Sequence, residues 1–278
     1  MGKKKISVIM SVYKENIQQL ENSINSILNQ AFDNIEFIIV LDNPNNLVAK
    51  NFILKIIKND SRIIFLENKK NMWLAYSLNK AIKNTSWKYI ARMDADDISD
   101  INRLKIQFVY LEKNKNIDLL FTWWTEIDEK NNKLLRIPKK EWFKKIKKYF
   151  FIKSMILHPT LMCKSKILKD NNYPIINRPE DFILFLDLIK KWYIFDILEE
   201  DLFLYTVQNY DLKLKFKKIN IYSQNFLPIL LKNKYYYFNI YFLYFTIRIL
   251  VEYILSRNYF IFKLFYINLF KIFKKLSI

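Results

Sequence analysis

Glycine is almost missing from this chain of 278 residues, because Gly2 is the only one. The P-loop and the dinucleotide-binding fingerprint both need several glycines where the backbone approaches a phosphate group. The sequence therefore argues against ATPases, kinases and dehydrogenases that use these motifs. A phosphate group bound here must be held mainly by a metal ion and by side chains.

Cysteine and histidine are equally scarce, with Cys163 and His158 as the single examples. One cysteine cannot form an intramolecular disulfide, and one histidine cannot supply a multi-histidine zinc site. The first ten residues also lack the long apolar run and the cleavage site of a signal peptide. A cytoplasmic location is the simplest interpretation.

Positive charge, in contrast, is abundant, since 46 Lys and Arg against 27 Asp and Glu leave a net charge of +19. Such a charge favours anionic partners, for example nucleotides, nucleic acid or acidic lipid headgroups, without choosing among them. Hydrophobic residues make up 51% of the chain. That is enough to bury the core of one α/β domain with an appendage.

Apolar runs rich in β-branched residues alternate with segments of helical period in the first half of the chain. This alternation is typical of βαβ units and predicts an α/β fold, with a Rossmann-like, mainly parallel sheet flanked by helices. Strands are expected at residues 6–10, 36–41, 63–66, 89–93 and 119–122, and helices near residues 17–28, 47–58, 73–83 and 101–111.

Polar clusters directly follow three of these strands, at residues 11–13, 42–43 and 94–97. Ligands bind at the carboxyl ends of the strands in open parallel sheets, so we expect the three clusters to line one crevice.

The third cluster contains the carboxylates Asp94, Asp96 and Asp97. Carboxylates so close together repel one another unless a cation or hydrogen bonds compensate. Mg²⁺ and Mn²⁺ prefer oxygen ligands and often use one or two protein carboxylates together with diphosphate oxygens. Capping of the next helix by Asp97, Ser99 or Asp100 is the alternative, but capping needs only one of these residues.

Beyond residue 205 the composition changes to apolar and aromatic runs punctuated by lysines. The uncharged run 235–247 is too short to cross a bilayer as a helix, which needs ~20 apolar residues. We expect basic, aromatic helices that lie on an anionic membrane surface. A helical pair packed on the domain, or on a second subunit as a homodimer, is the alternative.

Several motifs stand in a fixed order along about the first 200 residues. They are residues 7–13, Asn29-Gln30, Asp42, residues 91–97, Asn102-Arg103, Gln107, His158-Pro159-Thr160 and Glu180-Asp181. Together they resemble glycosyltransferase family 2, whose fold is GT-A and whose members invert the anomeric carbon.

The resemblance implies that Asp94 contacts the ribose or the metal and that Asp96 ligates a Mn²⁺ or Mg²⁺ bridging the nucleotide diphosphate. It also implies that Asp42 and the Val12-Tyr13 turn hold the uridine. Further nucleotide-sugar contacts implied in this way are Glu15, Asn71 and Ala95.

Asp181 matches the general base of the family. Such a base removes the proton of a sugar hydroxyl, which is a weak nucleophile, as it attacks. By themselves, Glu180 and Asp181 after Pro179 are also typical of an ordinary first helical turn. Further candidates for the active site are His158, Glu180, Arg92 and Asp97.

The chain departs from the family in two places. Many members carry Asn-x-Gly-Leu where this chain has residues 71–74, so the bulky Trp73 replaces a glycine. After the base, relatives often continue with Tyr-Asp-Leu-Trp, whereas residues 182–185 are wholly apolar. We expect a reshaped donor pocket and a different acceptor site.

We therefore predict an inverting transferase of the bacterial surface-glycan type. It would move galactose, glucose or an N-acetylhexosamine from a UDP-sugar to a hydroxyl of a glycan or lipid-linked glycan, such as lipooligosaccharide, capsule or exopolysaccharide. It would lie peripherally on the inner face of the plasma membrane. Residues 1–205 would form the GT-A domain, with a nucleotide-sugar half (1–125) and an acceptor half (126–205), and residues 206–278 the helical C-terminal region.

Two other functions compete with this prediction. A basic nucleic-acid-binding protein would explain the charge and the aromatic residues, but the basic residues are concentrated away from the expected crevice. A degenerate transferase that only binds is conceivable because of Trp73. Retention of Asp94, Asp96 and the Glu180-Asp181 pair argues against it.

Overall fold

The computed structural model describes residues 6–128, 130–137, 156–176, 179–207 and 254. Its helices and strands follow the alternation expected from the sequence. In chain order they are β1 (Ile6–Val12), α1 (Ile17–Leu28), β2 (Ile35–Leu41), α2 (Leu47–Ile57), β3 (Ile63–Glu67), α3 (Trp73–Lys83), β4 (Tyr89–Asp94), β5 (Ile98–Ser99), α4 (Arg103–Lys113), β6 (Leu119–Ile127), β7 (Lys133–Ile137), the 3₁₀ turn η2 (His158–Thr160), β8 (Met162–Lys164), α6 (Ser165–Asp170), α7 (Glu180–Lys190) and β9 (Phe195–Thr206).

Within the described residues, nine strands form one sheet in the order β3-β2-β1-β4-β8-β6-β9-β5, with β7 paired to β6. The strands β3, β2, β1 and β4 are parallel, as the sequence predicts. The second half is mixed, because β8 runs antiparallel to both β4 and β6, whereas β6 and β9 are parallel. The α/β prediction is confirmed, and the four strands of the N-terminal half are all parallel.

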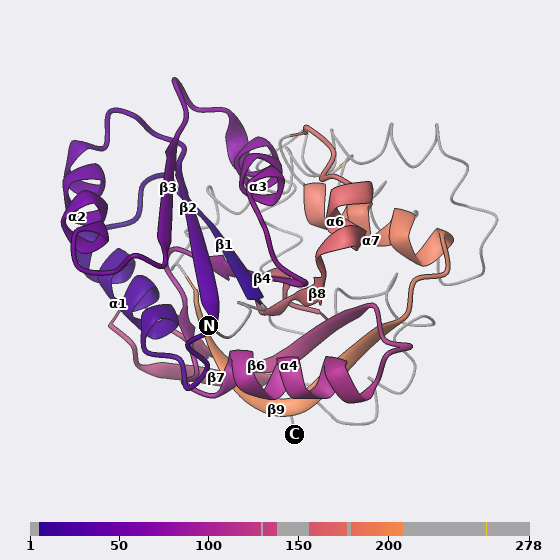
Figure 1. Ribbon diagram of the computed structural model, residues 1–278. Helices are drawn as coiled ribbons and strands as arrows, with labels where there is room; N and C mark the ends of the chain where they lie inside the picture. The colour runs from indigo at the N-terminus through magenta and orange to yellow at the C-terminus, as the bar shows by residue number, and fades with distance from the viewer. Residues whose placement is uncertain (1–5, 129, 138–155, 177–178, 208–253, 255–278) are drawn as a thin grey trace. The chain divides into compact units, whose positions relative to one another are not determined.

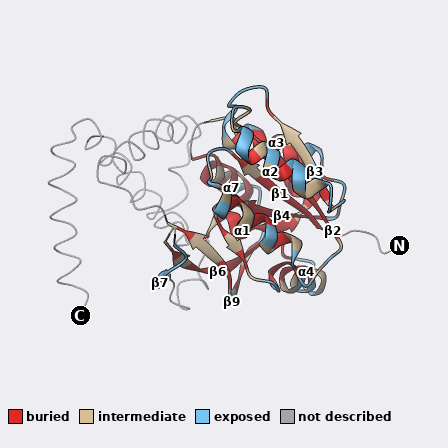
Figure 2. Ribbon diagram, turned by 90° about the vertical axis from the view of Figure 1, so that its left-hand side faces the viewer, coloured by how far each residue is buried: buried red, intermediate tan, exposed pale blue. Residues whose placement is uncertain are grey.

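Helices cover both faces of the parallel strands, and Figure 1 shows α1 and α2 on one side and α3 on the other. Alternate residues of β1, β2 and β4 form a core cluster with α1, α2 and α4, while α3 packs against β1 and β2. Strands β1, β2 and β4 are accordingly almost wholly buried (Figure 2). Continuous apolar strands are expected where both faces of a sheet are covered.

Local signals in the sequence set the bounds of the helices. Asn16 caps α1, since its Oδ1 accepts the N–H of Gln19 and the Gln19 Oε1 accepts the N–H of Asn16. Gln30 lies just past the end of α1. Its side-chain oxygen accepts the N–H of Leu104 in the first turn of α4. Of the three residues considered as caps of α4, Asp100 accepts the N–H of Asn102 at 2.8 Å just before the helix, whereas the carboxylate of Asp97 bonds to β9.

Contacts divide the chain into two units. The first comprises residues 1–146, 154–175 and 180–208 and contains the sheet. The second comprises residues 147–153, 176–179 and 209–278, most of which lie outside the described residues. The predicted domain boundary at residue 205 and the helices predicted beyond it therefore stay predictions. None of the helices in the described part is both long and apolar enough to cross a bilayer.

Candidate functional site

The carboxyl ends of the four parallel strands form one edge of the sheet. Register places Val12 opposite Leu41, Leu41 opposite Glu67 and Ser11 opposite Asp94. The N–H of Asp42 donates to the carbonyl of Val12 at 2.8 Å, which ties two of the predicted polar clusters together. The three clusters therefore meet at the same edge, as expected.

Asp42 lies buried at this edge with one oxygen fully engaged. Its Oδ1 accepts hydrogen bonds from Asn68 Nδ2 at 2.7 Å and from the backbone N–H of Met72 at 2.8 Å. Asn68 also donates to Ser77, and Lys80 donates to the Asn68 Oδ1. Sequence reasoning missed Asn68, although the signal was present, since Asn68 directly follows a strand like the other polar residues of this edge.

Trp73, next to Met72, has a backbone φ of 69°, in the left-handed region that favours glycine. Its N–H donates to the Oδ1 of Asn71 at 2.9 Å, and 52% of the residue is exposed. The structure thus keeps a glycine-type backbone here while presenting an indole at the surface. Trp123 and Trp124, in contrast, are buried and belong to the core.

The acidic cluster consists of Asp94, Asp96 and Asp97, which offer one oxygen each within 4.8 Å of one another. Burial and the charges of Asp94 and Glu15 raise the pKa of Asp96 to about 7. Burial and the charges of its two neighbours raise the pKa of Asp97 well above its usual range. The cluster therefore carries more negative charge than the surrounding protein stabilises.

Glu15 extends the acidic cluster from the loop after β1. Its carboxylate accepts the backbone N–H groups of Tyr13 at 2.7 Å and Lys14 at 3.1 Å. Burial, with a contribution from the charge of Asp94, raises the pKa of Glu15. The structure thus brings Glu15 and Tyr13 to the same edge as the aspartates.

Two buried arginines act on this cluster, since Arg92 pairs with Asp94 and the charge of Arg103 acts on Asp97. Arg92 is buried on β4 and forms an ion pair with Asp94. Burial lowers the pKa of Arg92, but the charge and hydrogen bond of Asp94 outweigh burial and raise it above the ordinary value.

Strand β9 fastens the acidic loop from the other side. Thr206 donates its N–H to Asp97 Oδ1 at 2.8 Å and its hydroxyl to the carbonyl of Asp96. Among the described residues, the other buried oxygen of Asp97, Oδ2, has no hydrogen-bond partner. Ala95 lies buried between the two aspartates. Sequence reasoning missed Thr206, because it lies 110 positions from Asp96.

A second polar array surrounds Asp181 at the start of α7. His158 Nε2 lies 2.7 Å from the hydroxyl of Tyr173, and His158 Nδ1 lies 3.8 Å from Asp181 Oδ2. The side chain of His158 is 6% exposed and that of Asp181 37%. Glu180, which precedes Asp181 in the chain, is buried. His158 and Asp181, predicted separately, are thus brought together, whereas Tyr173 had not been predicted.

The turn that carries His158 is held by α4. Arg103 is wholly buried, donates to the carbonyl of Pro159 at 2.9 Å and lies over the ring of Phe203. Gln107 donates to the carbonyl of Thr160 at 2.8 Å. Burial lowers the pKa of Arg103 to about 9. The Asn102-Arg103 and Gln107 motifs therefore support the site rather than line it.

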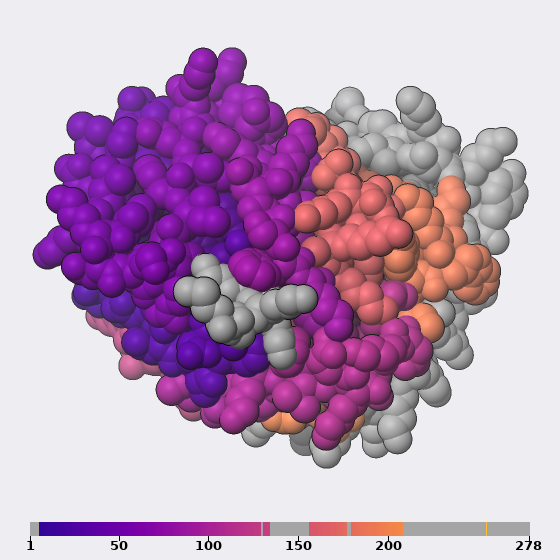
Figure 3. Space-filling view, in the orientation of Figure 1, coloured from indigo at the N-terminus to yellow at the C-terminus, as the bar shows by residue number. Residues whose placement is uncertain are grey.

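The surface of residues from β1 to α4, indigo to magenta, adjoins that of α6 and α7 in Figure 3, in keeping with the contacts between α3 and α6.

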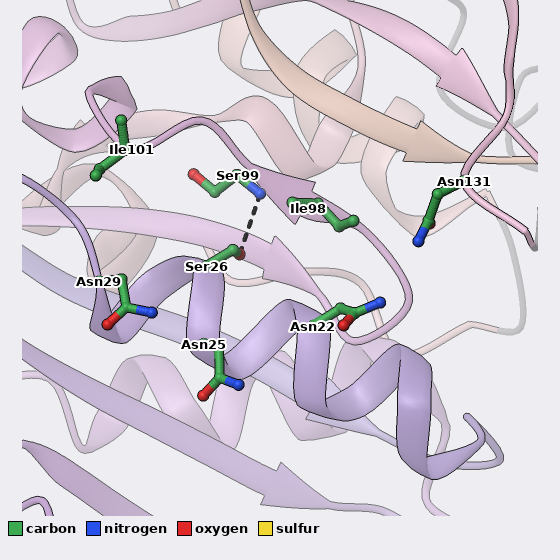
Figure 4. A pocket seen from close by; sticks show the side chains of 8 residues that line it. All are labelled: Asn22, Asn25, Ser26, Asn29, Ile98, Ser99, Ile101 and Asn131. Carbon is green, nitrogen blue, oxygen red and sulfur yellow. Dashed lines mark hydrogen bonds between the residues drawn. The ribbon is translucent and has the colours of Figure 1, made fainter.

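A hollow of about 380 Å³ lies elsewhere, over α1 and β5 (Figure 4). There, Ser26 accepts the N–H of Ser99 at 3.1 Å. Its lining offers amides, hydroxyls and apolar groups but no ionisable side chain: Asn22, Asn25, Ser26, Asn29, Ile98, Ser99, Ile101 and Asn131.

Comparison with known families gives one match, in which the sequence model of Glycosyl transferase family 2 covers residues 7–170. An uncharacterized glycosyltransferase of Methanocaldococcus jannaschii is 44% identical over 242 residues, covering 86% of this chain and 83% of the relative. The O-antigen biosynthesis glycosyltransferase WbnJ of Escherichia coli is 31% identical over 216 residues, covering 73% of this chain and 80% of WbnJ.

Solved structures share the fold at low sequence identity. S. aureus TarS 1-349 in complex with UDP-GlcNAc has a TM-score of 0.60 and 17% identity, covering 80% of this chain and 66% of TarS 1-349. The mannosyltransferase PcManGT from Pyrobaculum calidifontis, in complex with GDP-Man and Mn²⁺, has a TM-score of 0.62 and 13% identity, covering 81% of this chain and 64% of PcManGT. The chain thus spans about two-thirds of each of these proteins.

Proposed function

The chain belongs to glycosyl transferase family 2 and has the GT-A fold, and from this premise we propose that it transfers a sugar from a UDP-sugar to a hydroxyl group with inversion at the anomeric carbon. The observation that carries the proposal is the acidic cluster, which lies at the carboxyl end of β4 on the same edge as Asp42. Ligands bind at this edge in open α/β sheets.

Three features of the acidic cluster fit a divalent cation. Its donors are all carboxylate oxygens, which suit Mg²⁺ or Mn²⁺. Burial, together with the charges of Asp94 and Glu15, raises the pKa of Asp96, and the buried Asp97 Oδ2 has no hydrogen-bond partner in the described part of the chain. Asp94 and Asp96 would hold the ion, which when bound supplies a positive charge that stabilises a departing diphosphate.

UDP is the proposed nucleotide, with Asp42, Val12, Tyr13, Glu15 and Asn71 around it. Support comes from the resemblance on these residues and from TarS, which binds UDP-GlcNAc. PcManGT binds GDP-Man on the same fold, so GDP is the necessary control.

Asp181 is the proposed general base. As the acceptor oxygen bonds to the anomeric carbon, its proton passes to the Asp181 carboxylate and the bond from that carbon to the diphosphate breaks. The partial exposure of Asp181 leaves its carboxylate within reach of an acceptor. The ion pair with Arg92 would keep Asp94 in place at the donor site.

The proposed acceptor is a bacterial surface glycan, free or lipid-linked. Support comes from WbnJ, whose name assigns it to O-antigen biosynthesis. Attachment to the inner face of the plasma membrane, and the alternative homodimer, rest on the composition of residues 206–278. Family membership favours the transferase over the nucleic-acid-binding alternative.

Calorimetric titration with UDP tests the donor site. We expect UDP to bind with Mn²⁺ and at least tenfold more weakly without it, and GDP and CMP to bind more weakly than UDP. Asp96→Ala should abolish the metal dependence, whereas Asp100→Ala, a carboxylate that only orders the turn before α4, serves as the matched control. Absence of any nucleotide binding by the wild-type protein would leave the degenerate-transferase alternative.

A further inference from the structure

The two oxygens of the Asp181 carboxylate face different groups. Asp181 Oδ1 accepts the backbone N–H of Phe182 at 2.7 Å, and Oδ2 faces His158 Nδ1 at 3.8 Å. Distances of this kind are often long without substrate and shorten in the reacting complex. What His158 presents to Asp181, an N–H or a lone pair, therefore changes the electrostatic environment of Oδ2.

His158 is a neutral imidazole in this structure. Burial and the charge of Arg92 lower its pKa well below the ordinary value, so at neutral pH the ring carries a single N–H. If that hydrogen is on Nδ1, it points at the carboxylate of Asp181 and stabilises it. If it is on Nε2, the Nδ1 lone pair faces the carboxylate and repels it.

The hydroxyl of Tyr173 is placed to select between these two tautomers. Its hydroxyl lies 2.7 Å from His158 Nε2. Burial raises the pKa of Tyr173 well above its usual range, so the hydroxyl keeps its proton and can donate it. When the tyrosine donates to Nε2, the ring hydrogen must lie on Nδ1, toward Asp181.

Tyr173 itself is held by α3. The buried Asn79 donates to the carbonyl of Tyr173 at 2.8 Å and accepts its N–H at 2.9 Å. Two bonds from one side chain fix the backbone of Tyr173 and hence the place of its ring. The other charged groups that face this tyrosine are Arg92 and Glu180.

We propose that Tyr173 is a positioning residue, whose hydroxyl donates to His158 Nε2 and thereby directs the Nδ1–H of His158 at the base Asp181. This inference rests on the proposed function only for its catalytic consequence. No proton crosses the imidazole: the proton of the acceptor hydroxyl stays on Asp181, and His158 remains neutral.

A single histidine allows the tautomer to be read directly. With ¹⁵N-labelled histidine, the full-length protein shows one imidazole, whose two nitrogen shifts distinguish Nδ1–H from Nε2–H. We expect the Nδ1–H form in the wild type and a mixture or the Nε2–H form in Tyr173→Phe. Tyr193→Phe is the matched control, because the hydroxyl of Tyr193 contacts Asn171 rather than His158. An Nε2–H wild type, or an unchanged spectrum in Tyr173→Phe, overturns the proposal.

Kinetics then test the catalytic consequence separately. Tyr173→Phe should lower kcat by roughly 10–100-fold, less than the ~10⁴-fold that a wrong tautomer costs where the histidine itself transfers the proton. The acid limb of its pH–rate profile should move to higher pH, with UDP affinity within about twofold of wild type. Wild-type kcat and pH profile in this variant would overturn the positioning role, whereas absent transfer in the wild type would count against the proposed function alone.

Discussion

The two polar regions of the site are built on opposite electrostatic plans. The acidic cluster gathers three carboxylates and Glu15 beside the buried Arg92 and Arg103, and burial raises the pKa of Asp96, Asp97 and Glu15. The array around Asp181 contains two neutral groups, His158 and Tyr173, that lie within hydrogen-bond distance of one another, with Arg92 and Glu180 as charged neighbours of Tyr173. The difference fits the proposal that a cation completes the first region and that the second orients the carboxylate of Asp181.

The largest expected effect is the loss of activity on replacing Asp181 in the second region. Asp181→Asn keeps the size of the side chain and its acceptor oxygen but removes the base, so kcat should fall by about 10²–10⁴-fold. UDP affinity in the presence of Mn²⁺ should stay within about twofold, because the donor site is elsewhere. Steady-state transfer assays beside calorimetry check this. Asp187→Asn, on the same helix, is the control, and wild-type turnover in Asp181→Asn would remove Asp181 from its role.

Removing a charge from the acidic cluster should stabilise the metal-free protein. Asp97→Asn keeps the oxygen that accepts the N–H of Thr206 but removes a buried charge that its neighbours repel. Without metal, the free energy of unfolding should rise by about 1–2 kcal/mol, as is common when a functional-site cost is relieved. Mn²⁺ should raise the melting temperature less than in the wild type. A destabilised variant with normal Mn²⁺ protection would mean that Asp97 is an ordinary structural carboxylate.

Protons and metal should compete for the acidic cluster. A ligand carboxylate must be ionised, so with the pKa of Asp96 at about 7, Mn²⁺ affinity should weaken by up to about tenfold per unit as the pH falls below 7. The same raised pKa means that the metal-free fold loses stability as the pH rises from about 4 to about 7, because Asp96 of the unfolded chain ionises first.

Calorimetry in buffers of different ionisation enthalpy checks this competition. Binding of Mn²⁺ should release about one proton near pH 6 and almost none near pH 8, and Asp96→Asn should abolish the difference. Equal proton release at both pH values would contradict the titration of Asp96 in the binding event.

The smallest expected effect concerns Trp73, at the edge of the first region. Glycine accepts a φ of 69° without strain, so Trp73→Gly should raise the free energy of unfolding by ~0.5–1 kcal/mol. UDP-sugar affinity should fall by about 3–10-fold, because an exposed indole next to the Asp42–Met72 bond can stack on the donor. Chemical denaturation and calorimetry measure both quantities.

Trp73→Asn separates the backbone from the ring. Asparagine tolerates the left-handed region, as Asn131 does in this chain, and has no aromatic face. It should lose affinity as Trp73→Gly does. A gain in stability with unchanged affinity in both variants would mean that the ring contacts no donor.

Sequence periodicity placed the first half of the fold well. Predicted and observed bounds agree closely for α1, α3 and β4, because their apolar residues repeat at the period of the element and pack on a sheet built from neighbours in the chain. The antiparallel strand β8 was not predicted. Three residues are too few to show a period, and this strand is defined by its antiparallel pairing with β4 on one side and β6 on the other.

The site divides in the same way. The acidic cluster could be predicted because its carboxylates stand within four residues at the end of one strand, and Asp181 and His158 because their motifs resemble a family. The residues that hold this site in place could not be predicted from the sequence. Asn68 donates to Asp42, Thr206 donates to the acidic loop, and Arg103 donates to the turn that carries His158.

The amino-acid sequence by itself determined the α/β class, the shared strand-end edge and the acidic cluster, since each depends on burial period or on residues close together in the chain. Tertiary structure alone decided which residues surround the base. Asn79 and Tyr173 are 94 positions apart, and Tyr173 and His158 are separated by a strand and a helix. They meet because β8 joins the sheet beside β4 and α6 packs against α3, an arrangement set by the packing of the whole domain rather than by any local pattern.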